Sequence, residues 1–501
     1  MSYITIRFRN VLIRGWLLQR ATIEEIMFLR IAILFISGYV AVGIALSPLE
    51  SFYPPDLNDT SYISKSSIGT YGGSYRAPTR EISFSNSSYG AYFYCSMPHP
   101  RAEEYKLPGP IQNGSIKAEV VYLEYLQRHQ RRTPYNILPS GETVPFNCSD
   151  ILTYLYAGPP SGQQPVLVYG QTYTSATNPF LGTYIPGTCQ YPQLTIGGLL
   201  DGYTHGHDLR SVYGSKLSLL PSSPSPQSTY FRSSESALTQ QSAGGVLRGV
   251  WPSYQGPLPL HQQASSLDTV NEGYSCPAIS STLSKIKSTA AWNDHLSITA
   301  SLRATLGSMF NANSSSSAWQ QTFDHFADNF QGRLCNGYEL PCSPTTGECV
   351  TQDMANEVFR AGDWEWNYYW RANPYVKEYI QLVEGLFIGE IVARLESVMN
   401  GTIGSGKYSH TFVHDGDIGP VIGALGINAL RWPGMGSNIA IEVWKTKSAN
   451  TTVSSPFFAR VLYSGQPLES IYGRMDWVPL SDLLAILKQY VPGDIIGQCN
   501  A

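Results

Sequence analysis

The sequence predicts an α/β protein with a mainly parallel central sheet flanked by helices and an inserted, mostly α-helical segment. Three observations favour this class. Residues 118–127 (AEVVYLEYLQ) form a nearly continuous apolar run, which is typical of a strand buried on both faces of a parallel sheet. Strand-like runs return from residue 408 onward, and the pattern between about 252 and 400 is mainly helical. A chain of 501 residues is long enough for one large domain with an insertion, or for two domains.

The N-terminal residues predict a targeting segment rather than a part of the fold. Residues 31–46 carry no charge, but these 16 residues fall short of the roughly 20 that span a bilayer comfortably. Gly43 and Ala45 are small residues suited to cleavage after Ala45, and translation from Met27 would give a leader of ordinary length. The alternative is an uncleaved signal anchor with the preceding arginines in the cytoplasm. Under either interpretation residues 1–49 direct the chain into the secretory pathway.

Cysteines and glycosylation sequons agree with a secreted glycoprotein. Eight cysteines allow four disulfides, and the sequence leaves their pairing open. The formal net charge of −4 gives no indication of nucleic-acid binding, and nothing in the sequence indicates an oligomeric state. Seven N-x-[ST] sequons are candidate glycan sites: Asn58, Asn86, Asn113, Asn147, Asn313, Asn400 and Asn450.

The first half of the chain predicts a loop-rich arm followed by α/β elements. Residues 50–117 are rich in Ser, Tyr, Gly and Pro and have little periodicity. After the strand at 118–127, residues 195–212 predict a helix with Thr195 as its N-cap. Residues 229–234 predict a short strand, and a helix is expected to follow it as far as Val250.

The second half predicts one long helix and then a return to strands. Residues 373–398 carry an apolar stripe at helical spacing. Residues 408–414 predict a strand and residues 418–427 a helix. Two later runs, 439–445 and 457–465, predict a pair of neighbouring strands.

Two of the predicted strands end in chemically active side chains. The first leads into RHQRRTP (128–134), where three arginines surround one histidine, and the strand at 408–414 ends in His414 and Asp415. Sites in open parallel sheets form beyond the carboxyl ends of the strands, so we expect the two histidines to meet there. Guanidinium groups gathered in such a crevice require an anion, and phosphate matches their paired donors.

These motifs resemble those of the histidine acid phosphatases, branch 2 of the histidine phosphatase superfamily. RHQRRTP resembles the family's RHGxRxP, and HD in FVHDGDIGPVIGALGI resembles its second motif. FRSSESALTQQSA (231–243) resembles the segment that carries a third phosphate-binding arginine, and YSCPA, WPGMGSN and MDWVPLSDLLAIL are similar to fungal secreted members. The resemblance runs from about residue 52 to 499. It implies a phosphoglycerate mutase-like fold, with a catalytic domain in two parts, residues 50–251 and 401–501, around a helical cap at 252–400.

The resemblance implies a secreted acid phosphatase that hydrolyses small-molecule phosphomonoesters through a phosphohistidine, with no metal and no cofactor. His129 would be the nucleophile, and Asp415 would protonate the leaving alcohol. Because Asp415 must carry a proton, we expect activity to fall above about pH 6–7. No lysine-rich loop flanks the motifs, which favours a general monoesterase over a phytase. The implied phosphate-binding side chains are Arg128, Arg132, Arg232 and His414.

One residue departs from the family pattern. Gln130 stands where RHGxRxP has glycine, a residue that permits close backbone approach and positive φ. If the site needs either property, the chain would be altered in specificity or would bind phosphate without turning it over. This non-catalytic protein is the alternative to the phosphatase.

Three other motifs do not predict functional sites. His205 and His207 in HGHD lie two apart on the predicted helix and would point to different sides, so they cannot grip one ion together. GTIGSGKY (401–408) has tyrosine where a P-loop has its metal-binding hydroxyl. The acidic residues of FDHFADNF (323–330) are expected on the surface of the cap.

Overall fold

The computed structural model describes residues 46–78, 90–154, 166, 168–179, 186–313, 316–447 and 455–501. The signal or anchor expected at residues 1–49 lies almost entirely outside these ranges, as do the sequons at Asn86 and Asn450. Among the helices of the described ranges, none combines the length and the apolar character needed to cross a bilayer.

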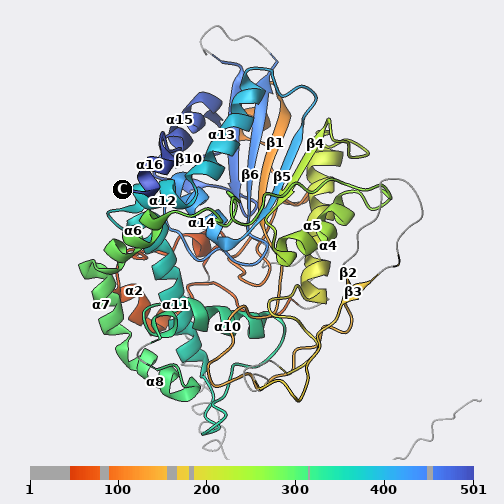
Figure 1. Cartoon of the computed structure of the whole chain (residues 1–501). Coiled ribbons are helices and arrows are strands. Elements are labelled where there is room, and N and C mark those ends of the chain that lie inside the picture. Colours follow the sequence, from red (N-terminus) through yellow and green to blue (C-terminus); the bar gives the residue numbers. More distant parts are fainter. Residues whose placement is uncertain are drawn as a thin grey trace, which may run out of the picture. The chain divides into compact units, whose positions relative to one another are not determined.

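A mixed sheet with the strand order β11-β7-β6-β1-β5-β4 lies at the centre of the fold (Figure 1). β1 (Ala118–Arg128) pairs in parallel with β5 (Tyr408–Val413), and β5 pairs in parallel with β4 (Thr229–Ser233). β6 (Asn438–Thr446) and β7 (Phe457–Tyr463) extend the sheet in antiparallel fashion. The predicted α/β architecture is confirmed, and its parallel part contains both strands that lead into the motifs. The short strands β8 (Gln466–Pro467) and β11 (Val478–Pro479) pair with β7.

Helices cover both faces of this sheet (Figure 1). α4 (Ile196–Leu209) and α5 (Ala237–Val250) pack against each other on one face, and α13 (Gly385–Met399) and α15 (Leu480–Lys488) lie on the other. The predicted N-cap of α4 is confirmed, because the Thr195 hydroxyl accepts a hydrogen bond from the Gly198 amide at 3.3 Å.

Two apolar cores result from the alternation of side chains along the strands. On β6, Ile439, Ile441 and Val443 pack into the core under α13 and α15, while Ala440 and Trp444 pack into the core under α4 and α5. Because both faces are buried, the strands read as continuous apolar runs in the sequence.

The single long helix predicted for residues 373–398 is wrong. The structure has two helices, α12 (Val376–Val383) and α13, which are separated at Glu384. The next residue, Gly385, lies against the C-terminal segment, where a Cβ atom would stand 2.7 Å from the Tyr490 carbonyl oxygen. A close backbone approach from a segment a hundred residues later in the sequence therefore interrupts an apolar pattern that looked continuous.

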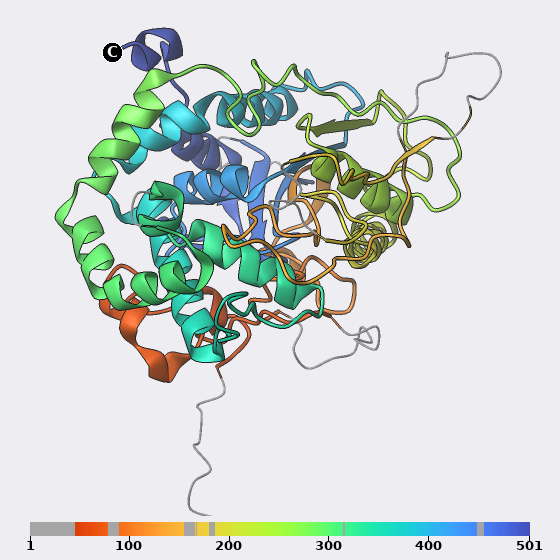
Figure 2. The ribbon, with the colours of Figure 1, turned by 60° about the horizontal axis from the view of Figure 1, so that its bottom comes forward.

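Further helices lie beyond the carboxyl ends of β1, β4 and β5 (Figure 1), and Figure 2 views the molecule with this end forward. They fall within residues 252–400, but α13 in the same range packs on the sheet, so the limits of a cap domain remain a prediction. These helices are α6 (Pro277–Lys287), α7 (Ala290–Ile298), α8 (Ala300–Phe310), α10 (Asp324–Cys335) and α11 (Gln352–Asn367).

Short elements complete the described chain. Before β1 the described residues hold only short helical turns and an isolated bridge between Ser74 and Phe93, which suits the loop-rich arm predicted for residues 50–117. The helical pieces are η1 (Glu50–Phe52), α2 (Ser61–Ser64), η2 (Ser66–Ile68), α3 (Gly109–Gln112), η4 (Arg210–Lys216), α9 (Ser317–Gln320), η5 (Tyr368–Ala372), α14 (Asp415–Ala424) and α16 (Ile495–Cys499). Two strand pairs lie apart from the main sheet: β2 (Thr153–Tyr154) with β3 (Tyr169–Gly170), and β9 (Glu469–Ser470) with β10 (Gly473–Arg474).

All eight cysteines are paired in four disulfides, which indicates an oxidising compartment such as the secretory pathway or the cell exterior. Two of the bridges join residues more than 200 positions apart, so they tie the segment before β1 and the C-terminal segment to helices of the 252–400 range. The pairs are Cys95–Cys335, Cys148–Cys189, Cys276–Cys499 and Cys342–Cys349.

Candidate active site

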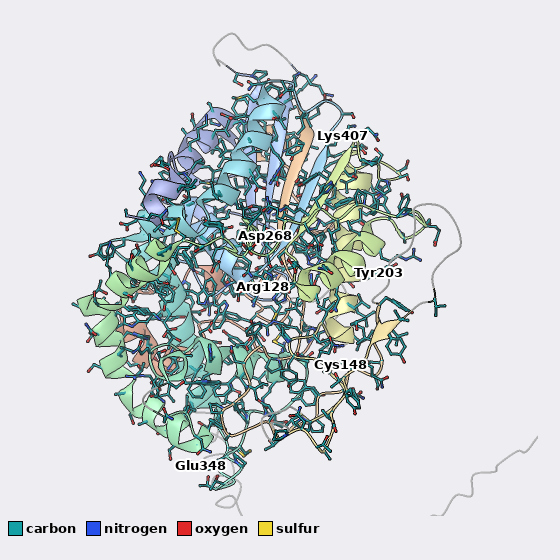
Figure 3. All side chains as sticks on the ribbon, viewed as in Figure 1. Arg128, Cys148, Tyr203, Asp268, Glu348 and Lys407 are labelled. Carbon is teal, nitrogen blue, oxygen red and sulfur yellow. A yellow bond between two sulfur atoms is a disulfide. The ribbon has the colours of Figure 1, made fainter. Side chains whose placement is uncertain are left out.

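The register of β1 and β5 brings the two motif histidines together. Arg128 lies opposite Val413, so His129 and His414 follow at the same edge of the sheet, with ring centroids 5.5 Å apart. The main chain fixes this arrangement, because the His129 amide donates to the Val413 carbonyl oxygen at 3.0 Å. Figure 3 shows Arg128 at this end of the sheet and Lys407, which precedes β5, at the opposite end.

His129 is buried and is held in one tautomer. Its Nδ1 lies 3.0 Å from the Gln130 carbonyl oxygen. Since a carbonyl oxygen only accepts, Nδ1 carries the proton and Nε2 keeps a free lone pair. Burial and the charges of Arg128 and Arg132 hold the pKa of His129 well below its usual range. The imidazole is therefore neutral, and nucleophilic at Nε2, in mildly acidic solution.

Arg128 is fully buried and forms an ion pair with Asp415, with 2.6 Å between Nη2 and Oδ2. The same oxygen accepts a hydrogen bond from the indole nitrogen of Trp432 at 2.7 Å. Burial alone would raise the pKa of Asp415, but the charge of Arg128 and the indole hydrogen bond outweigh it and lower that pKa. The resting site therefore holds Asp415 as a carboxylate.

Arg132 is paired with a carboxylate that the sequence did not single out. Its Nη1 lies 2.8 Å from Oδ1 of Asp328 in α10, a side chain that is only 4% exposed. The other carboxylate oxygen accepts hydrogen bonds from the backbone amides of Tyr135 and Asn136, at 2.8 and 2.9 Å. The expectation that the acids of FDHFADNF lie on the surface is wrong for Asp328, because helix α10 turns this residue inward onto the RHQRRTP loop.

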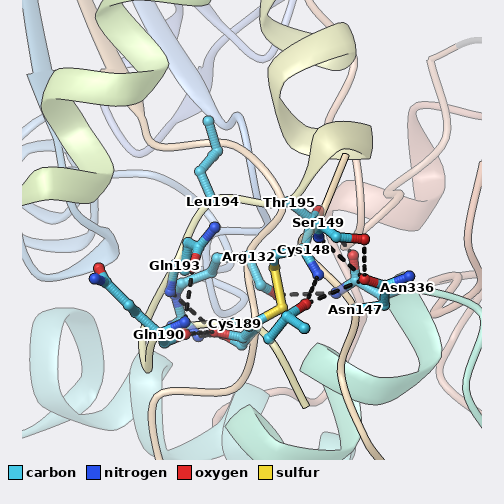
Figure 4. The surroundings of a disulfide bond; sticks show 12 residues. Arg132, Asn147, Cys148, Ser149, Cys189, Gln190, Gln193, Leu194, Thr195 and Asn336 are labelled. Carbon is cyan, nitrogen blue, oxygen red and sulfur yellow. Dashed lines mark hydrogen bonds between the residues drawn. A yellow bond between two sulfur atoms is a disulfide. The ribbon is translucent and has the colours of Figure 1, made fainter. Parts of the chain in front are cut away.

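The disulfide Cys148–Cys189 lies next to this arginine (Figure 4). The backbone of Arg132 forms an antiparallel bridge with Leu194, and the Asn336 side-chain amide donates to the Arg132 carbonyl oxygen at 2.9 Å. The backbone of the loop that carries Arg132 is thus held by two segments, one with Leu194 and one with Asn336.

His414 stands at the N-cap of α14 and faces β4. Its Nε2 lies 2.9 Å from the Ser234 hydroxyl, and its amide donates to Asp417 at 2.7 Å. Burial lowers the pKa of His414 to about 4, although Asp415 opposes this effect. Burial also raises the pKa of Asp417 to about 7.

The structure does not bring Arg232 into this group, contrary to the expectation from the sequence. On β4 Arg232 lies opposite Thr411, three positions before His414, and its side chain points to the α13 face. The guanidinium forms ion pairs with Asp268, at 2.8 Å, and with Glu390. Arg232 is therefore a buried structural ion-pair residue, and the site contains two arginines rather than three.

Gln130 is accommodated without unusual backbone geometry. It is not among the described residues with positive φ, and its amide donates to the Ser242 hydroxyl at 2.9 Å. Its side chain lies between Gly202 of α4 and Gly436, where a Cβ atom would stand 2.6 Å from Gln130 Oε1. Gly436, at φ +72°, also donates its amide to the His129 carbonyl oxygen at 3.0 Å. A glycine elsewhere in the fold thus provides the room that Gln130 needs.

The remaining polar residues of the motifs lie outside this group. Arg131 pairs with Asp201 of α4. His205 is buried against the Tyr125 hydroxyl at 2.7 Å, while His207 is exposed, so the two point to different sides as expected. In the part of the chain that the structure describes, no cluster of three or more His, Cys, Asp or Glu side chains is arranged to hold a metal ion.

Comparison with known families agrees with this geometry. The sequence model of the histidine phosphatase superfamily (branch 2) matches residues 119–464. The chain belongs to this family. Among curated relatives, Counting factor 60 of Dictyostelium discoideum is 26% identical over 75% of this chain and 84% of its own length. Human 2-phosphoxylose phosphatase 1 is 21% identical over 77% of this chain and 78% of its own length. Mouse lysophosphatidic acid phosphatase type 6 is 21% identical over 71% of this chain and 81% of its own length. Of solved structures, the Hafnia alvei phytase aligns with a TM-score of 0.47 at 13% identity, over 76% of this chain and 98% of its own.

Inspection of the sequence of this histidine phosphatase identified five of the clustered residues and missed three that support them. Trp432, Asp328 and Ser234 contact Asp415, Arg132 and His414 respectively. Each lies in a different segment of the chain from the residue it contacts, and none stands in a spacing that predicts the contact. Only the tertiary fold reveals them.

Proposed function

We propose that the chain is a phosphomonoester hydrolase that works at acid pH through a phosphohistidine formed on His129. The observation that carries the proposal is the pair of neutral imidazoles, 5.5 Å apart, flanked by Arg128, Arg132 and the carboxyl group of Asp415. Membership of the histidine phosphatases supports phosphatase chemistry in general, and two of the relatives carry a phosphatase in their names.

In the proposed reaction, the lone pair on Nε2 of His129 attacks phosphorus, and the bond from phosphorus to the ester oxygen breaks. Arg128, Arg132 and His414 hold the phosphoryl oxygens, because positioning and charge stabilisation dominate phosphoryl transfer. Asp415 gives its proton to the leaving oxygen, which spares the formation of an alkoxide. Water then attacks the phosphorus of the phosphohistidine and loses a proton to Asp415, the bond from phosphorus to Nε2 breaks with return of the lone pair to His129, and inorganic phosphate departs.

The charges of the resting site explain why acid pH is needed. Each arginine already has a carboxylate partner, Asp415 for Arg128 and Asp328 for Arg132. A phosphate dianion that entered this neutral group would lie beside two carboxylates, so binding favours a proton on Asp415. A phosphomonoester has its second pKa near 6, and its monoanion can supply that proton. We therefore expect activity below about pH 6 and a decline above about pH 6–7.

The same charge balance favours substrates with a single phosphate group. The two other arginines of the motifs, Arg131 and Arg232, are each paired with carboxylates of their own. A polyphosphorylated ring needs additional cations for its other phosphates. We therefore propose small-molecule phosphomonoesters in general, rather than a phytate-like compound, as the substrates.

His129→Ala provides the test. Purified wild-type protein is assayed with a phosphomonoester at pH 3–7 and quenched during turnover to trap an acid-labile, base-stable phosphoryl group. We expect the variant to lose both activity and label, and the matched variant of an exposed histidine, His207→Ala, to keep both. Wild-type protein that binds inorganic phosphate but shows no turnover would favour the non-catalytic alternative. Gln130, the reason for that alternative, has room for its side chain beside Gly436, which favours the phosphatase over the non-catalytic protein.

We also propose that the chain is a secreted glycoprotein. Its four disulfides suit the secretory pathway, and the five sequon asparagines within the described ranges are all exposed. A decrease in mass on treatment with an N-glycosidase would support this proposal, and an unmodified mass of the protein from its native source would contradict it. The five residues are Asn58, Asn113, Asn147, Asn313 and Asn400.

A further inference from the structure

We infer that Trp432 is a positioning residue for the reaction: together with Arg128 it holds one oxygen of Asp415, so that the other oxygen delivers the proton to the leaving group. The inference rests on the proposed function. Oδ2 of Asp415 lies 2.7 Å from the Trp432 indole nitrogen and 2.6 Å from Nη2 of Arg128. Among the described residues, Oδ1 accepts a hydrogen bond only from the amide of Gly416, at 3.1 Å.

The chemistry of the two partners decides where the proton can be. An indole N–H and a guanidinium group donate hydrogen bonds and cannot accept them. A proton on Oδ2 would therefore face two donors and displace at least one of them. The protonated form of Asp415 must carry its proton on Oδ1, which is the oxygen that remains available to the substrate.

The indole of Trp432 is fixed in place from several sides. The side chain is 5% exposed, and its ring stacks on Trp366 at 5.5 Å between centroids and 21° between planes. Gly362 lies beneath it, where a Cβ atom would stand 3.1 Å from the indole ring. The Trp432 amide also donates to Asp363 at 3.1 Å. The ring therefore cannot turn away from Asp415 without disturbing α11, which carries all three of these neighbours.

Charged and titratable groups from three other directions also face Asp415, and they act in addition to the indole. Arg128 comes from β1, and Arg132 comes from the loop after it. His414 and Asp417 flank Asp415 on α14. Arg128 and the indole both stabilise the carboxylate, so removal of the indole donor alone should make Asp415 easier to protonate while the guanidinium stays in place.

The test is Trp432→Phe, which keeps an aromatic ring and removes the donor. The pH dependence of kcat and of kcat/KM is measured with glycerol phosphate, whose leaving group needs a proton, and with p-nitrophenyl phosphate, whose leaving group does not. We expect the basic limb of the pH profile, on which activity falls as Asp415 loses its proton, to move up by about 1 pH unit. The variant lacks one charge-assisted hydrogen bond to the carboxylate, and such a bond corresponds to about one pKa unit. We also expect kcat for glycerol phosphate to fall by about tenfold and that for p-nitrophenyl phosphate to fall much less. Ionisation of the substrate is common to both proteins and cancels in the comparison.

Trp366→Phe is the matched control, because Trp366 packs on the same indole but has no hydrogen bond to Asp415. It should leave the basic limb in place. If Trp432→Phe lowers the melting temperature too far for assay, Gly362→Ala replaces it, since the new methyl group pushes on the indole ring and should give a smaller upward shift of the same sign.

An unmoved or downward-shifted basic limb in a folded variant, or an equal loss of kcat for the two substrates, would overturn the role of Trp432. Failure of the proposed function is recognised separately, since wild-type protein would then lack activity or His129→Ala would keep it.

Discussion

Replacement of Asp415 by asparagine should lower the rate of catalysis and, at the same time, strengthen the binding of phosphate. The variant keeps the shape of the side chain but loses the proton that the leaving group needs. A general acid contributes about 10²–10⁴-fold, so kcat for an alkyl phosphate should fall by that factor, and kcat for p-nitrophenyl phosphate should fall by much less. Because the Trp432 indole donates to Oδ2 of Asp415 and Arg128 forms an ion pair with the same oxygen, the amide oxygen of asparagine can take the place of Oδ2.

Phosphate affinity should increase in the same variant, and the structure gives the reason. In the resting site Arg128 forms an ion pair with Asp415 at 2.6 Å, and a phosphate must compete with that carboxylate for the guanidinium group. Unit charges about 4 Å apart interact by about 4 kcal/mol at an effective dielectric constant of about 20, and a tenfold change in Kd needs only about 1.4 kcal/mol. We therefore expect inorganic phosphate to bind at least about tenfold more tightly at pH 7. The gain should shrink toward pH 4, because phosphate binds there as its monoanion and can give its proton to Asp415 in the complex, which removes the repulsion.

Isothermal titration with inorganic phosphate at pH 7 and pH 4, together with steady-state kinetics on the two substrates, tests both parts. Weaker phosphate binding by Asp415→Asn at pH 7 would refute the description of the resting site as an arginine neutralised by its own acid. Equal losses of kcat for alkyl and aryl substrates would refute the assignment of Asp415 as the proton donor.

Three further predictions concern the surroundings of the site. Arg232→Met should leave KM and kcat within about twofold but cost about 3–5 kcal/mol of unfolding free energy, because it leaves the buried carboxylate of Asp268 without its cation and leaves Glu390 with Arg394 alone. A KM rise of tenfold or more in the folded variant would restore Arg232 to the phosphate site. Gly436→Ala should destabilise the protein by about 1–3 kcal/mol, since φ is +72° and the methyl group would overlap the side chain of Gln130. In the double variant, Gln130→Gly should relieve part of this loss. Equal melting temperatures for Gly436→Ala and wild type would contradict this packing. The pKa of His414 is about 4 in the folded protein and about 6.5 when unfolded, so the unfolded state binds more protons between these values and this side chain adds stability as the pH rises through them. The advantage of wild type over His414→Asn in unfolding free energy should therefore grow by up to about 3 kcal/mol from pH 4 to pH 7. A difference that stays constant with pH would show that the imidazole is not buried in its neutral form.

How much could be predicted from the sequence depended on the range of the interactions involved. Strand β1 and the meeting of His129 with His414 follow from an apolar run and from the rule that sites form at the carboxyl ends of parallel strands, which needs no knowledge of distant contacts. The boundary between α12 and α13 could not be predicted, because the Tyr490 carbonyl that meets Gly385 comes from the C-terminal segment.

The two errors at the site have the same origin. Arg232 was expected at the site because its segment resembles a family motif. The register of β4 instead turns its side chain toward Glu390 of α13 and toward Asp268. Asp328 was expected on the surface because its segment is polar, yet it pairs with Arg132 across 196 residues of sequence. Local pattern sets which elements form, whereas the partner of a buried charge is decided by the element that packs opposite it.

The pairing of each site arginine with its own carboxylate also affects how a ligand arrives. A site whose charges cancel projects little field beyond the Debye length of about 8 Å at physiological ionic strength, and the chain as a whole carries a formal charge of −4. Anions are consequently not drawn in from a distance, and chloride or sulfate in the medium gains little by entering. The rate at which a substrate associates with the site should thus depend little on ionic strength. Recognition of phosphate should begin only on contact, when the phosphomonoester brings its own proton to Asp415.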